Sequence, residues 1–239
     1  MTETLYYTAL ILVSLELAAL LGKMTRIHIL ALVLRTLAAW AGVVFVIVRA
    51  GRPPLYGPFE ASIFIAALGG TLALIFGKKP QKPGLFYLAS ALTALGVLAL
   101  QWGKPMEFNP DYYMYANLWV ILFFNFRLLG VSVLLHGTTQ YLTFAMAGSK
   151  VYQAGGRNTL LAGACVYLAG EWTGSLWCLN WLGDSWQWSH GFFKASILFL
   201  LVMAACHQPK PKDGPRHPAI QGITGALPGL FGIYMIFFH

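Results

Sequence analysis

Long apolar blocks fill most of this sequence and leave few folds open to it. Eight blocks approach or reach the length of about 20 residues that a helix needs to cross a hydrocarbon core. They run over Leu5–Leu21, Ile27–Val48, Pro58–Phe76, Leu85–Trp102, Leu118–Leu135, Thr159–Trp177, Phe192–His207 and Ile220–Phe238. Within them, polar and apolar residues do not alternate as in a transmembrane β-strand. The pattern predicts an all-α, polytopic transmembrane helix bundle of about eight spans, in one integral membrane domain over residues 1–239.

Lys and Arg residues are concentrated in alternate connections between these blocks. The connections after the first, third, fifth and seventh blocks carry Lys23, Arg26, Lys78, Lys79, Lys82, Lys150, Arg157, Lys210, Lys212 and Arg216. The positive-inside rule places these connections in the cytoplasm and both termini outside. The formal charge of +8 therefore indicates topology in a cell inner (cytoplasmic) membrane, with membrane lipid as a partner, and no nucleic-acid binding.

Two histidines are expected at similar depth near the cytoplasmic side. His28 opens the second block and His207 closes the seventh. Two neutral imidazoles from facing helices can bind a haem iron axially, although each can equally be an ordinary interfacial histidine. Arg35 lies two turns after His28 on nearly the same face, about 10 Å further along the axis. An arginine at that depth requires a partner, either a haem propionate or a glutamate from another helix. His136, at the predicted inner end of the fifth block, is a fallback ligand or a plain interfacial residue.

The connection after the sixth block is rich in tryptophan. Its tryptophans, with those of the block before it, are Trp172, Trp177, Trp181, Trp186 and Trp188. One interpretation is an aromatic belt at headgroup depth. The other is a flat platform for an apolar ligand such as porphyrin or quinone.

Three carboxylates lie in or at the edge of the blocks, at Glu16, Glu60 and Glu171. Intramembrane carboxylates are candidate functional groups. Glu60 and Glu171 are expected toward the outer ends, where they either relay protons from a quinol or pair with Arg49, Arg52 or Arg127.

Four stretches match, in order, the motifs of one known family. H-I-L-A-L-V-L-R at His28–Arg35 is similar to an early membrane histidine followed by arginine. G-R-P-P-L-Y-G-P-F-E at Gly51–Glu60 is similar to the pattern G-x-x-P-L-x-x-x-[YF]-E. T-G-S-L-W-C-L-N-W-L-G-D-S-W-Q-W at Thr173–Trp188 is similar to T-G-x-x-W … G-x-x-W-x-W-D, and one helix later comes His207. Together these stretches resemble the CcsA-type cytochrome c assembly proteins, a haem-handling family with a tryptophan-rich external segment.

The resemblance implies a set of haem ligands. In that family two membrane histidines ligate a haem within the bilayer, and His28 and His207 occupy the matching positions. Two external histidines of the family ligate the haem being delivered. Here the first falls on Phe123–Asn125, and only His239 is available for the second. The aspartate that ends the family's tryptophan motif is replaced by Ser189. The resemblance thus implies a retained membrane haem site and a lost external site.

These observations predict a b-haem electron carrier between the quinone pool and a periplasmic c-type cytochrome or other redox subunit. It would be the membrane haem subunit of a quinone-linked respiratory oxidoreductase, with one bis-histidine haem b and a quinone as cofactors. The residues expected at cofactors are His28 and His207 as axial ligands, Arg35 at a propionate, and Trp177, Trp186, Trp188 and Glu60. One alternative is haem delivery for cytochrome c maturation, with His190 or His239 replacing the lost ligands. The other is a membrane anchor without haem.

The charge distribution generates a topology test. In a chain whose native cysteines are replaced by alanine, Lys79→Cys should not react with a membrane-impermeant thiol reagent in intact cells. It should react in inside-out vesicles, because the positive-inside rule puts this connection in the cytoplasm. Lys104→Cys, in an outer connection, is the matched control and should react in intact cells. Labelling of position 79 from outside would contradict the orientation.

Overall fold

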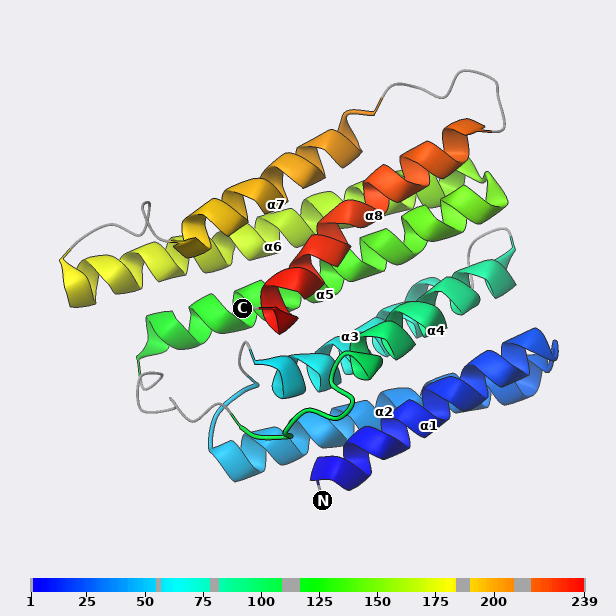
Figure 1. The fold of residues 1–239 in the computed structure, drawn as a ribbon, viewed down its shortest axis with the longest axis horizontal. Coiled ribbons are helices and arrows are strands. Elements are labelled where there is room, and N and C mark those ends of the chain that lie inside the picture. The colour runs from blue at the N-terminus through cyan, green and yellow to red at the C-terminus, as the bar shows by residue number, and fades with distance from the viewer. Residues whose placement is uncertain are drawn as a thin grey trace.

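The computed structural model describes residues 2–54, 57–77, 82–108, 117–183, 190–208 and 216–238. This part of the chain forms eight α-helices that run up and down in turn (Figure 1). In chain order they are α1 (Thr2–Leu21), α2 (Thr25–Ala50), α3 (Pro58–Phe76), α4 (Pro83–Ala99), α5 (Leu118–Ala147), α6 (Lys150–Leu182), α7 (His190–Cys206) and α8 (Arg216–Phe237).

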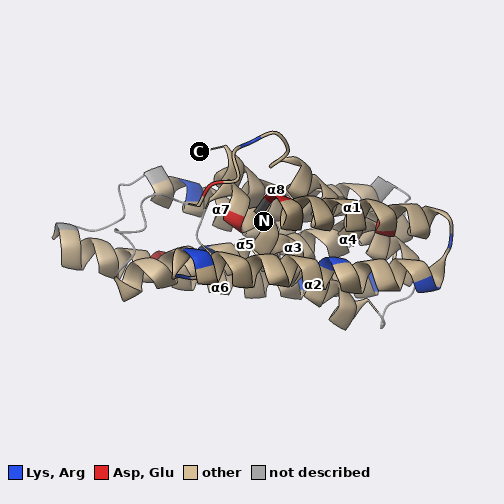
Figure 2. Cartoon of the chain, turned by 90° about the horizontal axis from the view of Figure 1, so that it is seen from below, with Lys and Arg blue, Asp and Glu red and all other residues tan. Residues whose placement is uncertain are grey.

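Five of these helices, α1, α2, α3, α5 and α8, are long and apolar enough to cross a membrane. Helices α4 and α7 are apolar but shorter, with 17 residues each, and α6 is longer, at 33 residues, and more polar. Figure 2 shows mostly uncharged ribbon along the helices, with few charged residues inside them. The chain is therefore an all-helical, multi-pass membrane protein, as the apolar blocks predict.

Glycine and proline mark several helix ends. Helix α2 ends at Gly51 with φ of 66°, and α5 ends at Gly148 with φ of 67°. This left-handed conformation is easily reached only by glycine. Helices α3 and α4 begin with Pro58 and Pro83, whose missing N–H removes one of the groups that a helix start leaves unbonded. These residues fix where the chain turns back across the bundle.

Helices α5 and α6 extend well beyond the apolar blocks that predict them. The polar residues in the extensions satisfy one another: Gln140 donates to the Thr159 hydroxyl at 3.1 Å, and Gln153 donates to Gln221 of α8 at 2.9 Å. Since these side chains are paired inside the bundle, the helices need no apolar sequence to continue there. Hydropathy alone therefore places the end of α5 too early in the sequence and the start of α6 too late.

Helix α5 is the centre of the bundle. It packs on α6 and α8 along one side and on α3 and α4 along the other, while α1 and α2 pack on each other, with α1 also on α4 and α2 on α3. The main contacts of α7 are with α8 and α6. Figure 1 shows α1 and α2 on one side of the bundle and α7 on the opposite side. Helices α2 and α7 are thus separated by the helices between them.

Small residues let α6 approach α5 closely. Three glycines recur every seven residues along α6: Gly156, Gly163 and Gly170. An added Cβ would collide with α5 at the first two, at 2.7 and 2.9 Å, and would be closely crowded by α5 at the third, at 3.2 Å. The facing residues on α5 recur at the same interval in reverse order: Tyr141, Leu134 and Arg127. Such small-residue seams drive helix association in lipid, where apolar burial gives no advantage. The α5–α6 hairpin is therefore held by close backbone packing.

This seam generates a stability test. A Cβ added at Gly163 would lie 2.9 Å from Leu134 Cγ and 3.0 Å from the Leu134 backbone nitrogen. Gly163→Ala should therefore destabilise the bundle by about 1–3 kcal/mol, measured by thermal unfolding in detergent. Gly84→Ala on α4, where nothing lies within 4 Å, is the matched control and should not lower the melting temperature. Equal stability of the two variants would refute the close seam.

Candidate functional site

His28 lies in the first turns of α2, in the core at one end of the bundle. It is 6% exposed, and its ring lies 5.1 Å from that of Tyr87 on α4. Its Nε2 atom is buried and has no hydrogen-bond partner among the described residues. A buried imidazole nitrogen in this state is available to a metal, a water or a ligand donor.

Arg35 is fully buried and pairs with a glutamate. Its Nε donates to Oε2 of Glu16 on α1 at 2.9 Å, and both side chains have zero exposure. Of the two partners expected for this arginine, the structure therefore provides the glutamate. Within the described part of the chain, Nη1 and Nη2 of Arg35 and Oε1 of Glu16 remain without partners. Unsatisfied charged groups are costly in a core, so this cluster has spare capacity to bind water or an anionic group.

His207 follows the end of α7 and is exposed. Its Nδ1 lies 2.9 Å from the Met203 carbonyl oxygen, which can only accept, so Nδ1 carries the proton. In the neutral imidazole, the lone pair is then on Nε2. Histidines that ligate metals are typically oriented in this way, by a backbone carbonyl or carboxylate on the other nitrogen. His207 is thus an exposed imidazole whose ring is oriented by a backbone carbonyl.

The structure does not bring His28 and His207 together. His28 faces α4 from α2, whereas His207 is exposed at the end of α7, on the opposite side of the bundle (Figure 1). Similar depth, which the sequence predicts, does not make two residues lateral neighbours. The expected bis-histidine pair is therefore not assembled within this single chain.

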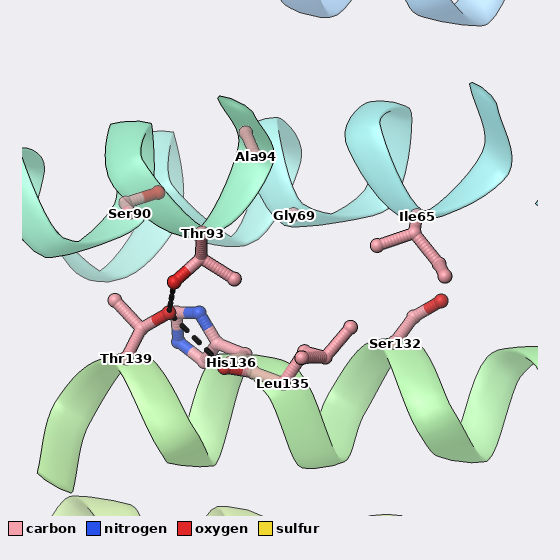
Figure 3. Close-up of a pocket in the computed structure, with 9 residues that line it drawn as sticks. All are labelled: Ile65, Gly69, Ser90, Thr93, Ala94, Ser132, Leu135, His136 and Thr139. Atoms are coloured by element: carbon pink, nitrogen blue, oxygen red, sulfur yellow. Dashed lines mark hydrogen bonds between the residues drawn. The ribbon is translucent and has the colours of Figure 1, made fainter. Parts of the chain in front are cut away.

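His136 lies in the core of the bundle and not at an interface. It is 4% exposed, and its ring lies 5.5 Å from Phe76 and 5.7 Å from Phe86. Its Nε2 is also buried without a partner in the described structure. The ring borders a cavity of about 20 Å³ that the hydroxyl residues Ser90, Thr93, Ser132 and Thr139 also line (Figure 3). Hydropathy could not locate this polar cavity, because its hydroxyls are spread over two apolar helices.

The two carboxylates that are expected toward the outer ends are both in ion pairs. Glu60 accepts from Arg52 in two contacts, Nη1 to Oε2 at 2.8 Å and Nη2 to Oε1 at 3.0 Å. Glu171 accepts from Arg127 at 2.6 Å. The expected alternatives for Glu60 and Glu171 were proton relay and pairing, and the structure shows the pairing. Arg127 also lies 4.2 Å from the centre of the Phe123 ring, a cation–π contact.

Aromatic residues pack together at the start of the tryptophan motif. Trp177 is half-buried against Phe123, with ring centres 6.3 Å apart. Phe123 is 2% exposed and abuts Gly174. Phe123 begins the stretch where the family resemblance would place an external haem ligand. The structure fills it with a packed hydrophobic side chain.

Part of the predicted outer site cannot be placed. Trp186, Trp188 and His239 lie outside the described residues, and the side chain of His190 does too. Whether the tryptophans form one platform therefore stays a prediction.

No protein-family model, curated protein sequence or solved structure matches this chain. The resemblance to CcsA-type proteins therefore depends on the sequence motifs alone. Among the described residues, no group of three or more His, Cys, Asp and Glu side chains is placed to hold a metal ion. A bis-histidine haem needs only two ligands.

The three histidines differ in the room that they offer a porphyrin. His28 is packed against Tyr87, and the cavity at His136 holds about one water. His207 instead follows an exposed apolar stripe of α7 formed by Ile197, Leu200 and Met203. A porphyrin can lie against this stripe without displacing core residues. The residues present thus fit one axial position of a haem at His207.

The Glu16–Arg35 pair generates a double-mutant test. Glu16→Leu should destabilise the protein by about 3–5 kcal/mol, because it leaves a buried guanidinium uncompensated. The double variant Glu16→Leu/Arg35→Met should be markedly more stable than Glu16→Leu alone, since both charges are removed. Unfolding in detergent measures both. If Glu16→Leu is as stable as the wild type, Arg35 has another principal partner.

Proposed function

We propose that this chain is a haem b-binding protein of the cell inner (cytoplasmic) membrane that crosses it eight times, with both termini outside. It carries electrons between the quinone pool and a periplasmic c-type cytochrome or another redox subunit. The motifs shared with CcsA-type proteins support the haem, and the alternating basic connections support the topology. The structural observation that carries the proposal is the exposed imidazole of His207, which a backbone carbonyl orients through Nδ1.

The geometry changes which ligand pair the proposal requires. His207 supplies one axial ligand from the exposed face of α7, and the second comes from a partner subunit packed on that face. Ligation by two histidines gives a haem that exchanges electrons and leaves no open position for chemistry on iron. The apolar stripe of Ile197, Leu200 and Met203 offers the porphyrin a contact surface.

His28 is a weaker candidate in this arrangement. Its free Nε2 and the two free Nη atoms of Arg35 match an iron and a propionate. However, Tyr87 packs directly on the imidazole. A haem there requires the α2–α4 packing to open, whereas a haem at His207 does not.

The packed outer side favours electron transfer over haem delivery. Delivery needs an external holding site, and Phe123, Gly174 and Arg127 are tightly packed where the resemblance would put one. A membrane electron carrier needs no such site. Haem delivery is the runner-up, and loss of cytochrome c maturation on deletion of the chain would favour it.

Haem spectra of the complex purified from membranes test the proposal. His207→Ala should abolish the low-spin signal or turn it high-spin, because it removes one axial ligand. His28→Ala and His136→Phe, which change buried imidazoles on other helices, should keep the low-spin spectrum. If His28→Ala loses the signal as His207→Ala does, the pair implied by the family resemblance is correct. A wild-type complex without haem, from cells supplied with it, would support the anchor alternative.

A further inference from the structure

An open groove runs between α4 and α8 over the central helix α5. It has a volume of about 380 Å³, within the range of small-molecule sites. Its walls are almost wholly apolar, and they include Leu92, Gly96, Leu100, Leu142, Leu230 and Ile233. Because these residues lie in apolar helices, the groove opens toward lipid.

The floor of this groove adjoins the polar cavity at His136. Thr93 and Leu135 line both spaces. The Thr93 hydroxyl lies 3.3 Å from that of Thr139, and Figure 3 shows the His136 ring beside this contact, between α5 and α4. The groove therefore reaches Thr93, whose hydroxyl donates to the Ala89 carbonyl oxygen at 2.9 Å, and the cavity that His136 borders lies behind it.

His136 gives this floor an unmet hydrogen-bonding requirement. Its Nε2 is buried and has no partner among the described residues. The adjoining cavity of about 20 Å³ admits one water. A water there can connect Nε2 to a ligand oxygen at Thr93, which satisfies the imidazole.

Two other grooves of similar volume serve as internal comparisons. One lies between α1 and α4, lined by Leu20 and Leu85, and the other lies between α6 and α7, lined by Leu168 and Phe199. Neither is lined by a residue with an unpartnered buried polar atom in the described structure. The α4–α5–α8 groove shares Thr93 and Leu135 with the cavity that His136, which carries such an atom, borders.

We propose that the α4–α5–α8 groove binds an isoprenoid quinone, with a ring oxygen beside Thr93 that is hydrogen-bonded through one water to Nε2 of His136. A lipid acyl chain would pack against the apolar walls of the groove but has no oxygen to place at its floor. A charged headgroup would not enter so apolar a groove. A neutral ring with oxygens at its edge and an isoprenoid tail matches both. The inference depends on the proposed function for the quinone pool as source, and it names the site.

The test is photolabelling of the detergent-purified complex with an arylazido derivative of decylubiquinone, competed by unlabelled decylubiquinone. Competed label should map by mass spectrometry to α4, α5 and α8 around the groove. Gly96→Leu should lower competed labelling at least tenfold. An added Cβ at Gly96 meets nothing within 4 Å, so the leucine fills the groove without disturbing the fold. Gly84→Leu, on the same helix and equally open but in the α1–α4 groove, should label like the wild type.

The polar floor is tested separately. His136→Phe keeps a ring in the core but removes Nε2. Because the quinone then loses about one hydrogen bond, the concentration of unlabelled decylubiquinone that halves the labelling should rise roughly tenfold. Labelling that survives Gly96→Leu, or that maps to another groove, would overturn the site. An unchanged competitor requirement in His136→Phe would overturn the role of the floor.

The haem spectrum separates this inference from the proposed function. Gly96→Leu should keep the low-spin haem signal, because His207 lies at the end of α7, away from the α4–α5–α8 groove. If the wild-type complex has a normal haem spectrum but shows no labelling that unlabelled decylubiquinone competes, the quinone site alone is overturned. Normal labelling in a complex without haem would overturn the electron carrier and leave the site standing.

Discussion

A charged side chain inside a hydrocarbon layer needs a partner, and in the described part of the chain three buried arginine–glutamate pairs meet that requirement. Arg35 with Glu16 joins α2 to α1, Arg52 with Glu60 joins the α2–α3 connection to α3, and Arg127 with Glu171 joins α5 to α6. Each pair links segments that are neighbours in the sequence. Because removing one partner of such a pair is far costlier than removing both, the pairs hold α1 against α2 and α5 against α6, where apolar burial in lipid gives no advantage.

Two features of the structure could be predicted from the sequence: the positions of the helices and the need of buried carboxylates for a partner. Apolar length located all eight helices, and the block Pro58–Phe76 coincides with α3. The pairing of Glu60 and Glu171 with arginines was one of two open alternatives, since a carboxylate in a span must bind something. Which arginine each one binds depends on helix neighbours, which hydropathy does not encode.

The positions of the histidines could not be predicted correctly from the sequence. His136 follows the last residue of its apolar block and was expected near an interface. Helix α5 continues to Ala147 because its polar side chains bond with α6, and this continuation places His136 in the core. The sequence predicts a similar depth for His28 and His207, but α2 and α7 lie on opposite sides of the bundle (Figure 1). Depth follows from a one-dimensional pattern, whereas adjacency depends on the close α5–α6 and α5–α8 packing that puts α7 on the far side.

The position of the haem iron distinguishes these accounts most directly. In the purified complex, a nitroxide on Ala204→Cys reports on the end of α7, and one on Met24→Cys reports on the start of α2; both positions are exposed. Pulsed electron paramagnetic resonance then measures the distance from each label to the low-spin iron. The account predicts a short distance from position 204 and a much longer one from position 24. The reverse order would contradict a haem on the α7 face and place it at His28.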